Sequence, residues 1–277
     1  MGSRRGEAGQ RRKEGPEVGD RKRLLLTVDL NADLGEGFGA SVAPADDELL
    51  DAVSSANIAC GFHAGDAMTM SRTARAAKQR GVAIGAHPSY PDIPGFGRRE
   101  LGLAPSEIEH HVTYQLSALA QICAAEGARM AYVKPHGALY NRAARDPQAA
   151  KSIVRSMRAV DSTLTLLGLP SSEMSRAAED GSIRFANEAF VDRAYTPAGT
   201  LVPRSEPNAV LHDVDEAVAR AITLVSEGTL LAADGTELRI DAQSLCVHGD
   251  NPESASMMRQ LRKRLETSGV RIAPFAA

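Results

Sequence analysis

The sequence predicts a single α/β domain in which parallel strands close into a barrel covered by helices. Short apolar runs alternate with longer segments of helical spacing about seven times along the chain, and this alternation is typical of parallel strands joined by right-handed helical crossovers. The first run is not followed by the Gly-x-Gly-x-x-Gly turn that marks the dinucleotide-binding sheet, the open alternative to a barrel. The composition shows no break that would divide the chain into two domains.

Seven apolar runs are the predicted strands, and they occupy residues 24–30, 56–60, 82–86, 130–133, 164–169, 185–191 and 244–247. Helical spacing predicts helices between them, among others at residues 46–54, 68–80, 106–126, 147–160 and 215–227. The clearest is 106–126, where apolar side chains recur on one helical face. Ser106 is its expected N-cap, and Glu109 three residues later completes a capping box.

The first 23 residues form a basic tail that is expected to be disordered. They contain eight basic and four acidic side chains, and Val18 is their single large apolar residue, so they cannot form a core. The tail lacks the hydrophobic stretch of a signal peptide, and its acidic residues do not suit an organelle transit peptide. We therefore expect the folded domain to span residues 24–277.

The overall composition argues against several classes of function. The net charge of the 277 residues is −3, so it does not point to nucleic acid or to an anionic membrane as a partner. No apolar run is long enough to span a membrane. Three cysteines that lie far apart disfavour a disulfide framework and make the reducing cytoplasm the expected compartment.

Residues capable of chemistry gather where the predicted strands end. Acidic and amide side chains follow the first run, and a histidine or a lysine follows four of the others; the set is Asp29, Asn31, Asp33, Glu36, His63, His87, Lys134, His136 and His248. Because the C-terminal ends of parallel barrel strands meet at one face, we expect these side chains to share a site. Asp29, Asn31 and Asp33 alternate along one strand, so they should point to the same side.

Two kinds of site are compatible with these residues. Asp33, His63 and His136 have the makeup of a divalent-metal site. In a metal-free site, the carboxylates would act as bases, the imidazoles would carry protons and Lys134 would be an electrostatic clamp. Arg98 and Arg204 follow in loops, where an arginine can bind a carboxylate or a phosphate.

Each of these residues also has a structural alternative. An aspartate at the end of a strand is most often a helix N-cap or a turn residue, which applies to Asp33, Asp66 and Asp250. A single buried histidine is usually a hydrogen-bonded core residue. Several strand-end histidines taken together favour the functional interpretation.

Seven segments closely resemble the LamB/YcsF family and occur in the family's order. They are DLNADLGE at 29–36, SSANIACGFHAGD at 54–66, GAHPS at 85–89, VKPHGALY at 133–140, EAFVDR at 188–193, LVPR at 201–204 and CVHGD at 246–250. The resemblance covers residues 24–275, and motifs of this length are highly specific. The chain departs from the family's pattern in its basic tail and in a slightly longer loop at 38–45.

This resemblance implies a seven-stranded parallel β/α barrel of the glycoside hydrolase/deacetylase type. It also implies the role of the A subunit in an ATP-dependent 5-oxoprolinase, which opens the lactam of 5-oxo-L-proline to L-glutamate. ATP with Mg²⁺ would then be the cofactor, and subunits B and C would be the partners. Assembly with further copies of this chain is left open.

The resemblance further implies roles for individual residues. Positive side chains are expected to hold phosphate and carboxylate groups: Arg98, Lys134 and Arg204. The candidate bases for water are Asp33 and Glu36. Protons are expected to move through His63, His136 and His248. Asn31 and His87 are expected to contact the substrate.

Two other functions compete with this one. The first is a stand-alone metal-dependent hydrolase of the carbohydrate or amide deacetylase kind, which would use Asp33, His63 and His136 as metal ligands. The second is a non-catalytic subunit that organises its partners. An activity that needs metal would indicate the metal-dependent hydrolase, whereas an activity that needs ATP and two other proteins would indicate the oxoprolinase. The non-catalytic subunit predicts that the strand-end histidines can be replaced without loss of the complex's activity.

Overall fold

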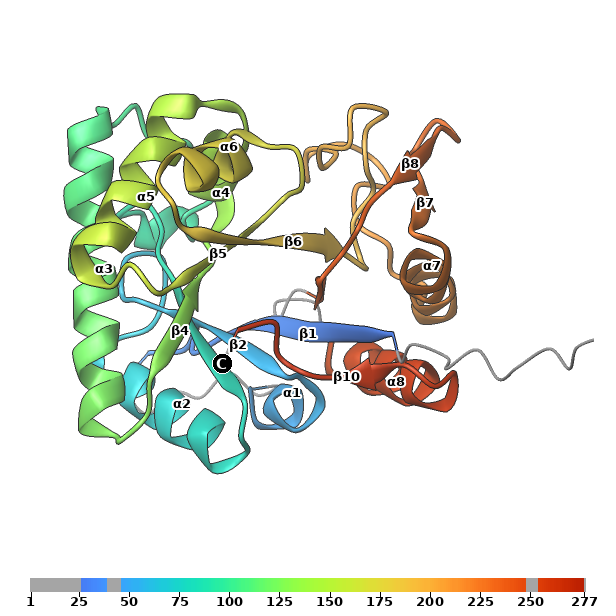
Figure 1. Cartoon of the computed structure of the whole chain (residues 1–277), viewed down its shortest axis with the longest axis horizontal. Coiled ribbons are helices and arrows are strands. Elements are labelled where there is room, and N and C mark those ends of the chain that lie inside the picture. The colour runs from blue at the N-terminus through green and yellow to red at the C-terminus, as the bar shows by residue number, and fades with distance from the viewer. Residues whose placement is uncertain (1–25, 39–45, 248–253, 277) are drawn as a thin grey trace, which may run out of the picture.

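The computed structural model describes residues 26–38, 46–247 and 254–276, and its centre is a closed barrel of seven parallel strands (Figure 1). The strands are β1 (Thr27–Leu34), β2 (Ser55–Ala59), β3 (Ala83–His87), β4 (Met130–Val133), β5 (Thr165–Gly168), β6 (Arg184–Phe190) and β9 (Ser244–Val247). Each strand pairs in parallel with the next in this order, and β9 pairs with β1 to close the barrel. The predicted barrel and its seven strands are confirmed.

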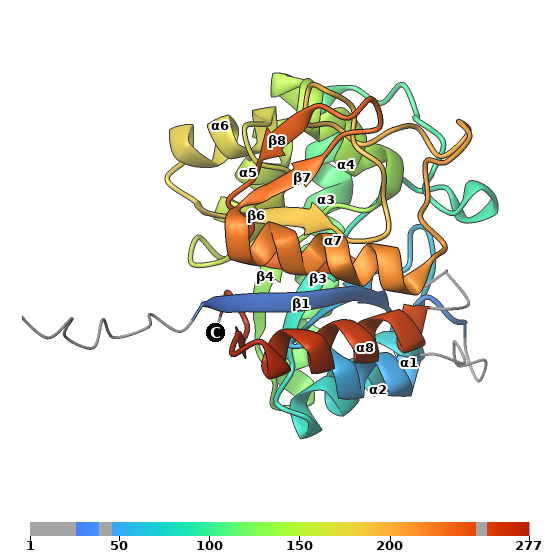
Figure 2. The same cartoon turned by 90° about the vertical axis from the view of Figure 1, so that its right-hand side faces the viewer.

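Helices surround the barrel and bury the apolar outer faces of its strands. They are α1 (Asp46–Ala52), α2 (Ala67–Gln79), α3 (Pro105–Ala125), α4 (Gly137–Arg145), α5 (Pro147–Val160), α6 (Glu173–Asp180), α7 (Val214–Glu227) and α8 (Ser254–Thr267), with the short 3-10 helix η1 (Ile93–Gly95) before α3. Helices α3 to α6 gather on one side of the barrel (Figure 1). Helices α7 and α8 pack side by side on another, as Figure 2 shows.

The described ranges contain three further short strands. β7 (Thr229–Leu231) and β8 (Glu237–Arg239) form an antiparallel hairpin after α7, and β10 (Arg271–Ile272) pairs in parallel with the start of β1. The sequence analysis predicted none of them, because strands of two or three residues are too short to show a hydrophobic period.

Strand β1 continues four residues beyond its predicted end, because its polar side chains point into the barrel and are hydrogen-bonded there. Asp29, Asn31 and Asp33 are all buried. Asn31 donates to the Ser244 hydroxyl at 2.7 Å, and Asn57 of β2 donates to Asp33 at 2.8 Å. The predicted common orientation of the three β1 residues is confirmed.

Helix α3 begins earlier than its predicted cap. Its N-cap is Ala104 and its first residue is Pro105, whose fixed φ suits the first helical position. The carboxylate of Glu107 accepts the N–H of Ala104 at 2.6 Å. Ser106 therefore lies inside the first turn, and its prediction as the N-cap with Glu109 was wrong.

Phe275 and Ala276 fill part of the barrel interior. Phe275 packs edge-on against Tyr132, with ring centroids 4.9 Å apart, and Ala276 joins the same buried cluster with Leu167. Tyr132 precedes Lys134 by two residues, so this apolar cluster lies nearer the N-terminal ends of the strands.

None of the helices in the described ranges is long and apolar enough to cross a membrane. The basic tail of residues 1–23 lies outside the described residues, and its disorder stays a prediction.

Candidate functional site

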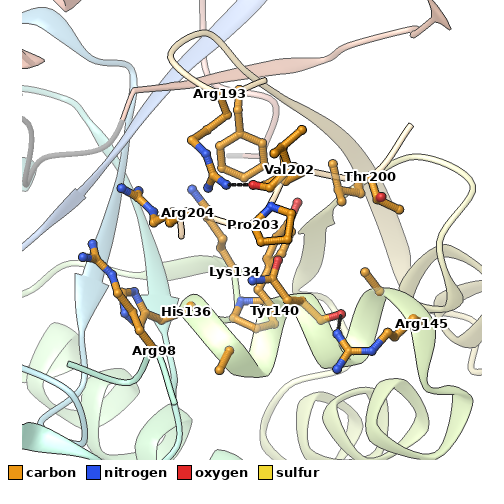
Figure 3. A pocket seen from close by; sticks show the side chains of 18 of the residues that line it. Arg98, Lys134, His136, Tyr140, Arg145, Arg193, Thr200, Val202, Pro203 and Arg204 are labelled. Atoms are coloured by element: carbon orange, nitrogen blue, oxygen red, sulfur yellow. Dashed lines mark hydrogen bonds between the residues drawn. The ribbon is translucent and has the colours of Figure 1, made fainter. Parts of the chain in front are cut away.

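A cavity of about 540 Å³ lies at the C-terminal ends of the barrel strands (Figure 3). Six residues predicted for the site line it: Asp33, His87, Arg98, Lys134, His136 and Arg204. The segment that follows β6, which carries Arg193, Thr200 and Pro203, lies across the cavity from α4 with Tyr140 (Figure 3). The structure brings four predicted strand-end residues, Asp33, His87, Lys134 and His136, into this one cavity, and the loop residues Arg98 and Arg204 line it as well.

A layer of hydrogen-bonded polar side chains lies deeper in the barrel. Asp29 accepts hydrogen bonds from Ser54 and Ser55, both at 2.6 Å, and a further one from Ser244. Burial raises the pKa of Asp29 to about 6, although these hydroxyl groups act to lower it. The layer satisfies a carboxyl group that would otherwise be costly to bury.

Lys134 stands at the centre of the cavity floor. Its Nζ lies 3.2 Å from Asp33 Oδ1 and 2.7 Å from Glu188 Oε1, and it donates to Asn31 Oδ1 at 3.1 Å. Burial acts to lower the pKa of Lys134, but Asp33 and Glu188 raise it well above its ordinary value. Two carboxylates from different strands thus compensate a positive charge at this position.

Glu188 and Tyr140 belong to this floor although the sequence analysis did not select them. The Tyr140 hydroxyl donates to Glu188 Oε2 at 2.9 Å, and both side chains are buried. One signal could have found Glu188, because it is a charged residue within a largely apolar predicted strand. A charge in that position needs a partner inside the protein.

Two strand-end histidines are each fixed by one ring nitrogen. His87 Nδ1 lies 2.7 Å from the carbonyl oxygen of Lys134, and His136 Nε2 lies 2.8 Å from that of Phe96. A carbonyl oxygen can only accept a hydrogen bond, so these nitrogens carry the hydrogen. The other nitrogens of the two rings, His87 Nε2 and His136 Nδ1, face each other at 3.0 Å.

His63 is oriented in the same way. The Ser89 hydroxyl donates its hydrogen to the Tyr90 carbonyl at 2.8 Å, so it accepts from His63 Nδ1, which lies 3.0 Å away. The other ring nitrogen, His63 Nε2, lies 3.1 Å from Glu36 Oε1.

The inner nitrogens of the three rings meet a carboxylate in what we call the histidine cluster: Glu36, His63, His87 and His136. One donor atom from each residue lies within 4.8 Å of the donor atoms of the others. The rings of His63 and His136 stack with centroids 3.8 Å apart. Burial, reinforced by neighbouring imidazoles, holds the pKa of His63 and of His136 well below the ordinary value.

The donor set of the histidine cluster fits a divalent transition metal. Neutral imidazoles and a carboxylate are zinc-type ligands, and their outer nitrogens are held by oxygen atoms as metal ligands commonly are. Stacked rings direct their lone pairs along parallel planes, so one ring must turn before His63 and His136 can reach one ion. Two members of the predicted metal trio, His63 and His136, belong to this set. The third, Asp33, does not: its Oδ1 lies 3.3 Å from His87 Nε2, and the carboxylate that approaches His63 is that of Glu36.

Gly97 lets a loop pass directly over these rings. Its φ is +63°, in the left-handed region that favours glycine. A Cβ at this position would stand 2.8 Å from His136 Cδ2 and 2.9 Å from His63 Cβ. The loop that holds the Phe96 carbonyl against His136 therefore depends on glycine at 97.

The remaining predicted residues have different surroundings. Asn31 is buried beneath the cavity, where it hydrogen-bonds Ser244 and Lys134. Asp66 is the N-cap of α2 and accepts the N–H of Thr69 at 2.8 Å, as its structural alternative predicted. His248 and Asp250 lie outside the described residues, so the role expected of His248 stays a prediction.

Four arginines line the cavity: Arg98, Arg193 and Arg204, and Arg145, which pairs with Glu100 (Figure 3). Arg193 is only 5% exposed, and it donates to the carbonyl oxygens of Ala209 at 3.1 Å and Val202 at 2.5 Å. Burial, followed by the nearby charge of Arg204, lowers the pKa of Arg193 to about 10. The sequence analysis selected Arg98 and Arg204 but missed Arg193, whose place just after β6 was the available signal.

The chain matches the model of the LamB/YcsF family over residues 28–277. It is 50% identical over 251 residues to the 5-oxoprolinase A subunit of Paracidovorax citrulli, covering 91% of this chain and 100% of that protein. It is also 50% identical over 249 residues to the 5-oxoprolinase A subunit of Streptomyces avermitilis, covering 90% of this chain and 100% of that protein.

A solved structure agrees with these sequence matches. The crystal structure of the lactam utilization protein from Thermus thermophilus superposes with a TM-score of 0.85 at 44% identity. The superposition covers 90% of this chain and 100% of that one.

Proposed function

Because the chain belongs to the LamB/YcsF family, we propose that it is the A subunit of a 5-oxoprolinase, which cleaves 5-oxo-L-proline to L-glutamate and hydrolyses ATP to ADP and phosphate. One observation carries the proposal: a single cavity joins Lys134 and four arginines to the Asp33 carboxylate and two imidazoles at the strand ends. The names of relatives that match nearly the whole chain support it.

The reaction needs ATP because a lactam is an unreactive amide. Transfer of the γ-phosphoryl group of ATP to the lactam oxygen yields ADP and an O-phosphorylated lactam with a more electrophilic ring carbon. Water adds to that carbon, and the C–N bond breaks as the ring nitrogen takes a proton, which leaves γ-glutamyl phosphate. A second water releases L-glutamate and inorganic phosphate.

The positive side chains are proposed to bind the substrate's anionic groups. Arg98, Arg204 and Lys134 would hold the carboxylate and phosphoryl groups, since guanidinium and ammonium groups donate several charge-assisted hydrogen bonds. Asn31 keeps Lys134 in place through its 3.1 Å contact, and His87 is proposed to contact the substrate from the cavity wall.

Proton transfer is proposed for the acids and histidines. Asp33 or Glu36 would take a proton from the attacking water. His63, His136 and His248 would carry protons towards the ring nitrogen, because an imidazole can both accept and donate a proton.

We further propose that ATP binds with Mg²⁺ and that partner subunits B and C complete the enzyme. The names of the relatives designate each of them as one lettered component of an oxoprolinase, which supports such partners. The three cysteines are free and buried, which suits the reducing cytoplasm, the compartment that we propose.

The histidine cluster supports a divalent metal and, with it, a second candidate function. Glu36, His63, His87 and His136 would hold the ion, which when bound would polarise an oxygen of the substrate or activate water. A stand-alone metal-dependent hydrolase would use the same cluster. A chelator would abolish the activity of that hydrolase, whereas the oxoprolinase requires ATP and two other proteins.

The test is reconstitution. Glutamate formation and 5-oxoproline-dependent ATP hydrolysis are measured with this chain alone, with candidate subunits B and C, and with B and C alone. We expect turnover only in the complete mixture. ATP-independent amide hydrolysis by this chain alone would favour the metal-dependent hydrolase, and full turnover by B and C alone would refute the proposal.

Variants test the assigned roles in the same assay. Asp33→Asn and His136→Ala should each reduce glutamate formation by about 100-fold or more, because proton transfer contributes roughly that much. Circular dichroism checks that each variant folds. Arg155→Ala is the control, since Arg155 lies on α5 and pairs with Glu109 on the outside of the barrel. A protein that only organises its partners would lose no activity in either variant.

A further inference from the structure

Lys134 uses every hydrogen of its ammonium group within the protein. Its Nζ donates to three atoms around it: Asn31 Oδ1 at 3.1 Å, Asp33 Oδ1 at 3.2 Å and Cys246 Sγ at 3.0 Å. An ammonium group has three hydrogens, so none is left for a molecule that enters the cavity. A ligand oxygen can therefore gain a hydrogen bond from Lys134 only if one of these partners gives way.

Asp33 is the one of these three partners that faces the cavity. Asp33 lines the cavity together with Lys134, whereas Asn31 and Cys246 are fully buried and do not line it. A ligand oxygen that reaches Lys134 therefore arrives on the side of Asp33. Asp33 keeps another hydrogen bond if Lys134 turns away, since its Oδ1 also accepts from Asn57 at 2.8 Å.

Glu188 offers the ammonium group a further acceptor that is not yet in use. Its Oε1 is buried 2.7 Å from Lys134 Nζ, yet within the described residues no donor is aligned with this oxygen to form a hydrogen bond. Its Oε2 is held by the Tyr140 hydroxyl, which donates to it at 2.9 Å. A buried carboxylate oxygen without a hydrogen bond is costly. A turn of the ammonium group about its Cε–Nζ bond would supply the missing hydrogen bond.

We propose that Glu188 is the positioning residue of Lys134, and that Asp33 is the partner that Lys134 exchanges for the ligand. When an anionic group enters the cavity, the ammonium group turns one hydrogen from Asp33 to that group and another to Glu188 Oε1. The charge of Glu188 keeps Lys134 at the floor during this exchange, because Tyr140 fixes the carboxylate in place. The identity of the ligand rests on the proposed function: it is 5-oxoproline, which carries a carboxylate.

The exchange makes the candidate base available only when the substrate is bound. Before the exchange, Asp33 Oδ1 accepts hydrogen bonds from both Asn57 and Lys134, which occupy the two lone pairs of that oxygen. Once the ammonium group has turned to the ligand, one lone pair of Oδ1 can accept a hydrogen from water beside the bound lactam. Of the two candidate bases, Asp33 and Glu36, the exchange therefore selects Asp33.

Two simpler roles for Glu188 make different predictions. If Glu188 acts by charge alone, removing its negative charge strengthens the binding of an anion to Lys134, and so does removing that of Asp33. If Glu188 only stabilises the fold, its replacement lowers the melting temperature and leaves the affinity for the ligand unchanged. The exchange predicts effects of opposite sign, because Asp33 competes with the ligand whereas Glu188 accepts the hydrogen that the turn of the ammonium group redirects.

The experiment is isothermal titration calorimetry of the full chain with 5-oxoproline, together with the melting temperature of each variant. Glu188→Met removes both the charge and the acceptor, so it should weaken binding by about 10- to 100-fold through the loss of a charge-assisted hydrogen bond. Glu188→Gln keeps an oxygen acceptor without the charge, so it should recover part of that loss. Asp33→Asn should bind at least as tightly as the wild type. Glu109→Gln is the control and should bind like the wild type, since Glu109 pairs with Arg155 on the outside of the barrel.

Several results would overturn the exchange. They are failure of 5-oxoproline to bind, equal affinities of Glu188→Met and Glu188→Gln, and weaker binding by Asp33→Asn than by Glu188→Gln. If Glu188→Met does not fold, the comparison of Glu188→Gln with Asp33→Asn decides alone. Binding is measured on this chain by itself, whereas the proposed function is measured by turnover with subunits B and C. The expected order of affinities without turnover would leave the exchange standing and remove the proposed function, and turnover without that order would do the opposite.

Discussion

Lys134 keeps its charge inside the barrel because two carboxylates from different strands are placed against it. Asp33 comes from β1 and Glu188 from β6, at 3.2 Å and 2.7 Å from the ammonium nitrogen. The three groups are buried together. Removing one partner of such an arrangement is far more damaging than removing the whole arrangement, since the remaining charges stay buried without compensation.

Replacement of Lys134 tests this arrangement. Lys134→Met should lower the free energy of unfolding by about 3–5 kcal/mol, because two buried carboxylates lose their counter-ion. Urea denaturation measures the loss. Adding Asp33→Asn and Glu188→Gln to the same chain should restore much of the stability. If the triple variant instead loses as much stability as the three single variants together, the three groups are not coupled.

The sequence could place most residues of the floor but not all their partners. Strand alternation correctly brought Asp33, Lys134 and His136 to one cavity, since alternation depends only on local geometry. It could not show that Glu36 approaches His63, because Glu36 follows a turn in which Gly35 has a φ of +68°. The direction of a side chain after such a turn depends on the whole surrounding loop.

At the scale of elements, alternation of apolar runs and helical spacing was enough to find the barrel. Helices α4, α6 and α8 were not among the examples named from the sequence; α4 is only nine residues long and begins directly after the strand-end residue His136. The β7–β8 hairpin was missed because three-residue strands are defined by their pairing rather than by their own pattern. Two adjacent residues, Pro105 and Ser106, could each mark the start of α3, and the helix begins at Pro105. A helix boundary therefore cannot be placed to the residue when start signals are adjacent.

Helix α2 offers a test of capping. Asp66 accepts the N–H of Thr69 at 2.8 Å, so Asp66→Ala should lower the free energy of unfolding by about 1 kcal/mol. Asp66→Ser keeps an oxygen acceptor and should lose less. Thermal and urea denaturation of both variants measure the effect. Equal losses in the two would mean that the hydrogen bond to the helix N-terminus is not what stabilises this end.

At the scale of the whole molecule, buried acids and buried histidines give opposing pH dependences. Burial raises the pKa of Asp29 and of Asp46 from 3.8 to about 6. Between pH 3.8 and about pH 6, these two carboxyl groups keep their protons in the folded protein but have lost them in the unfolded chain. The stability that the two groups contribute therefore falls as the pH rises. His63 and His136 have a pKa well below 6.5, so their contribution is lost as the pH falls.

One substitution separates the two effects. Asp46→Asn keeps an acceptor for the N–H of Gly35, which lies 3.2 Å from the Asp46 carboxylate, but it cannot ionise. Relative to the wild type, this variant should gain about 1 kcal/mol in the free energy of unfolding between pH 5 and pH 7. Urea denaturation at the two pH values gives the difference. Parallel pH dependences of the wild type and the variant would contradict the raised pKa.

The packing of Phe275 and Ala276 against Tyr132 has a consequence for turnover. In the described part of the barrel, these side chains occupy the end opposite the arginines, so reactant entry and product exit share one mouth. If the proposed function holds, glutamate and phosphate must then depart through it before the next substrate molecule arrives. A partner subunit docked over that mouth would control both events, and its dissociation, rather than bond cleavage, would then set the pace of the cycle.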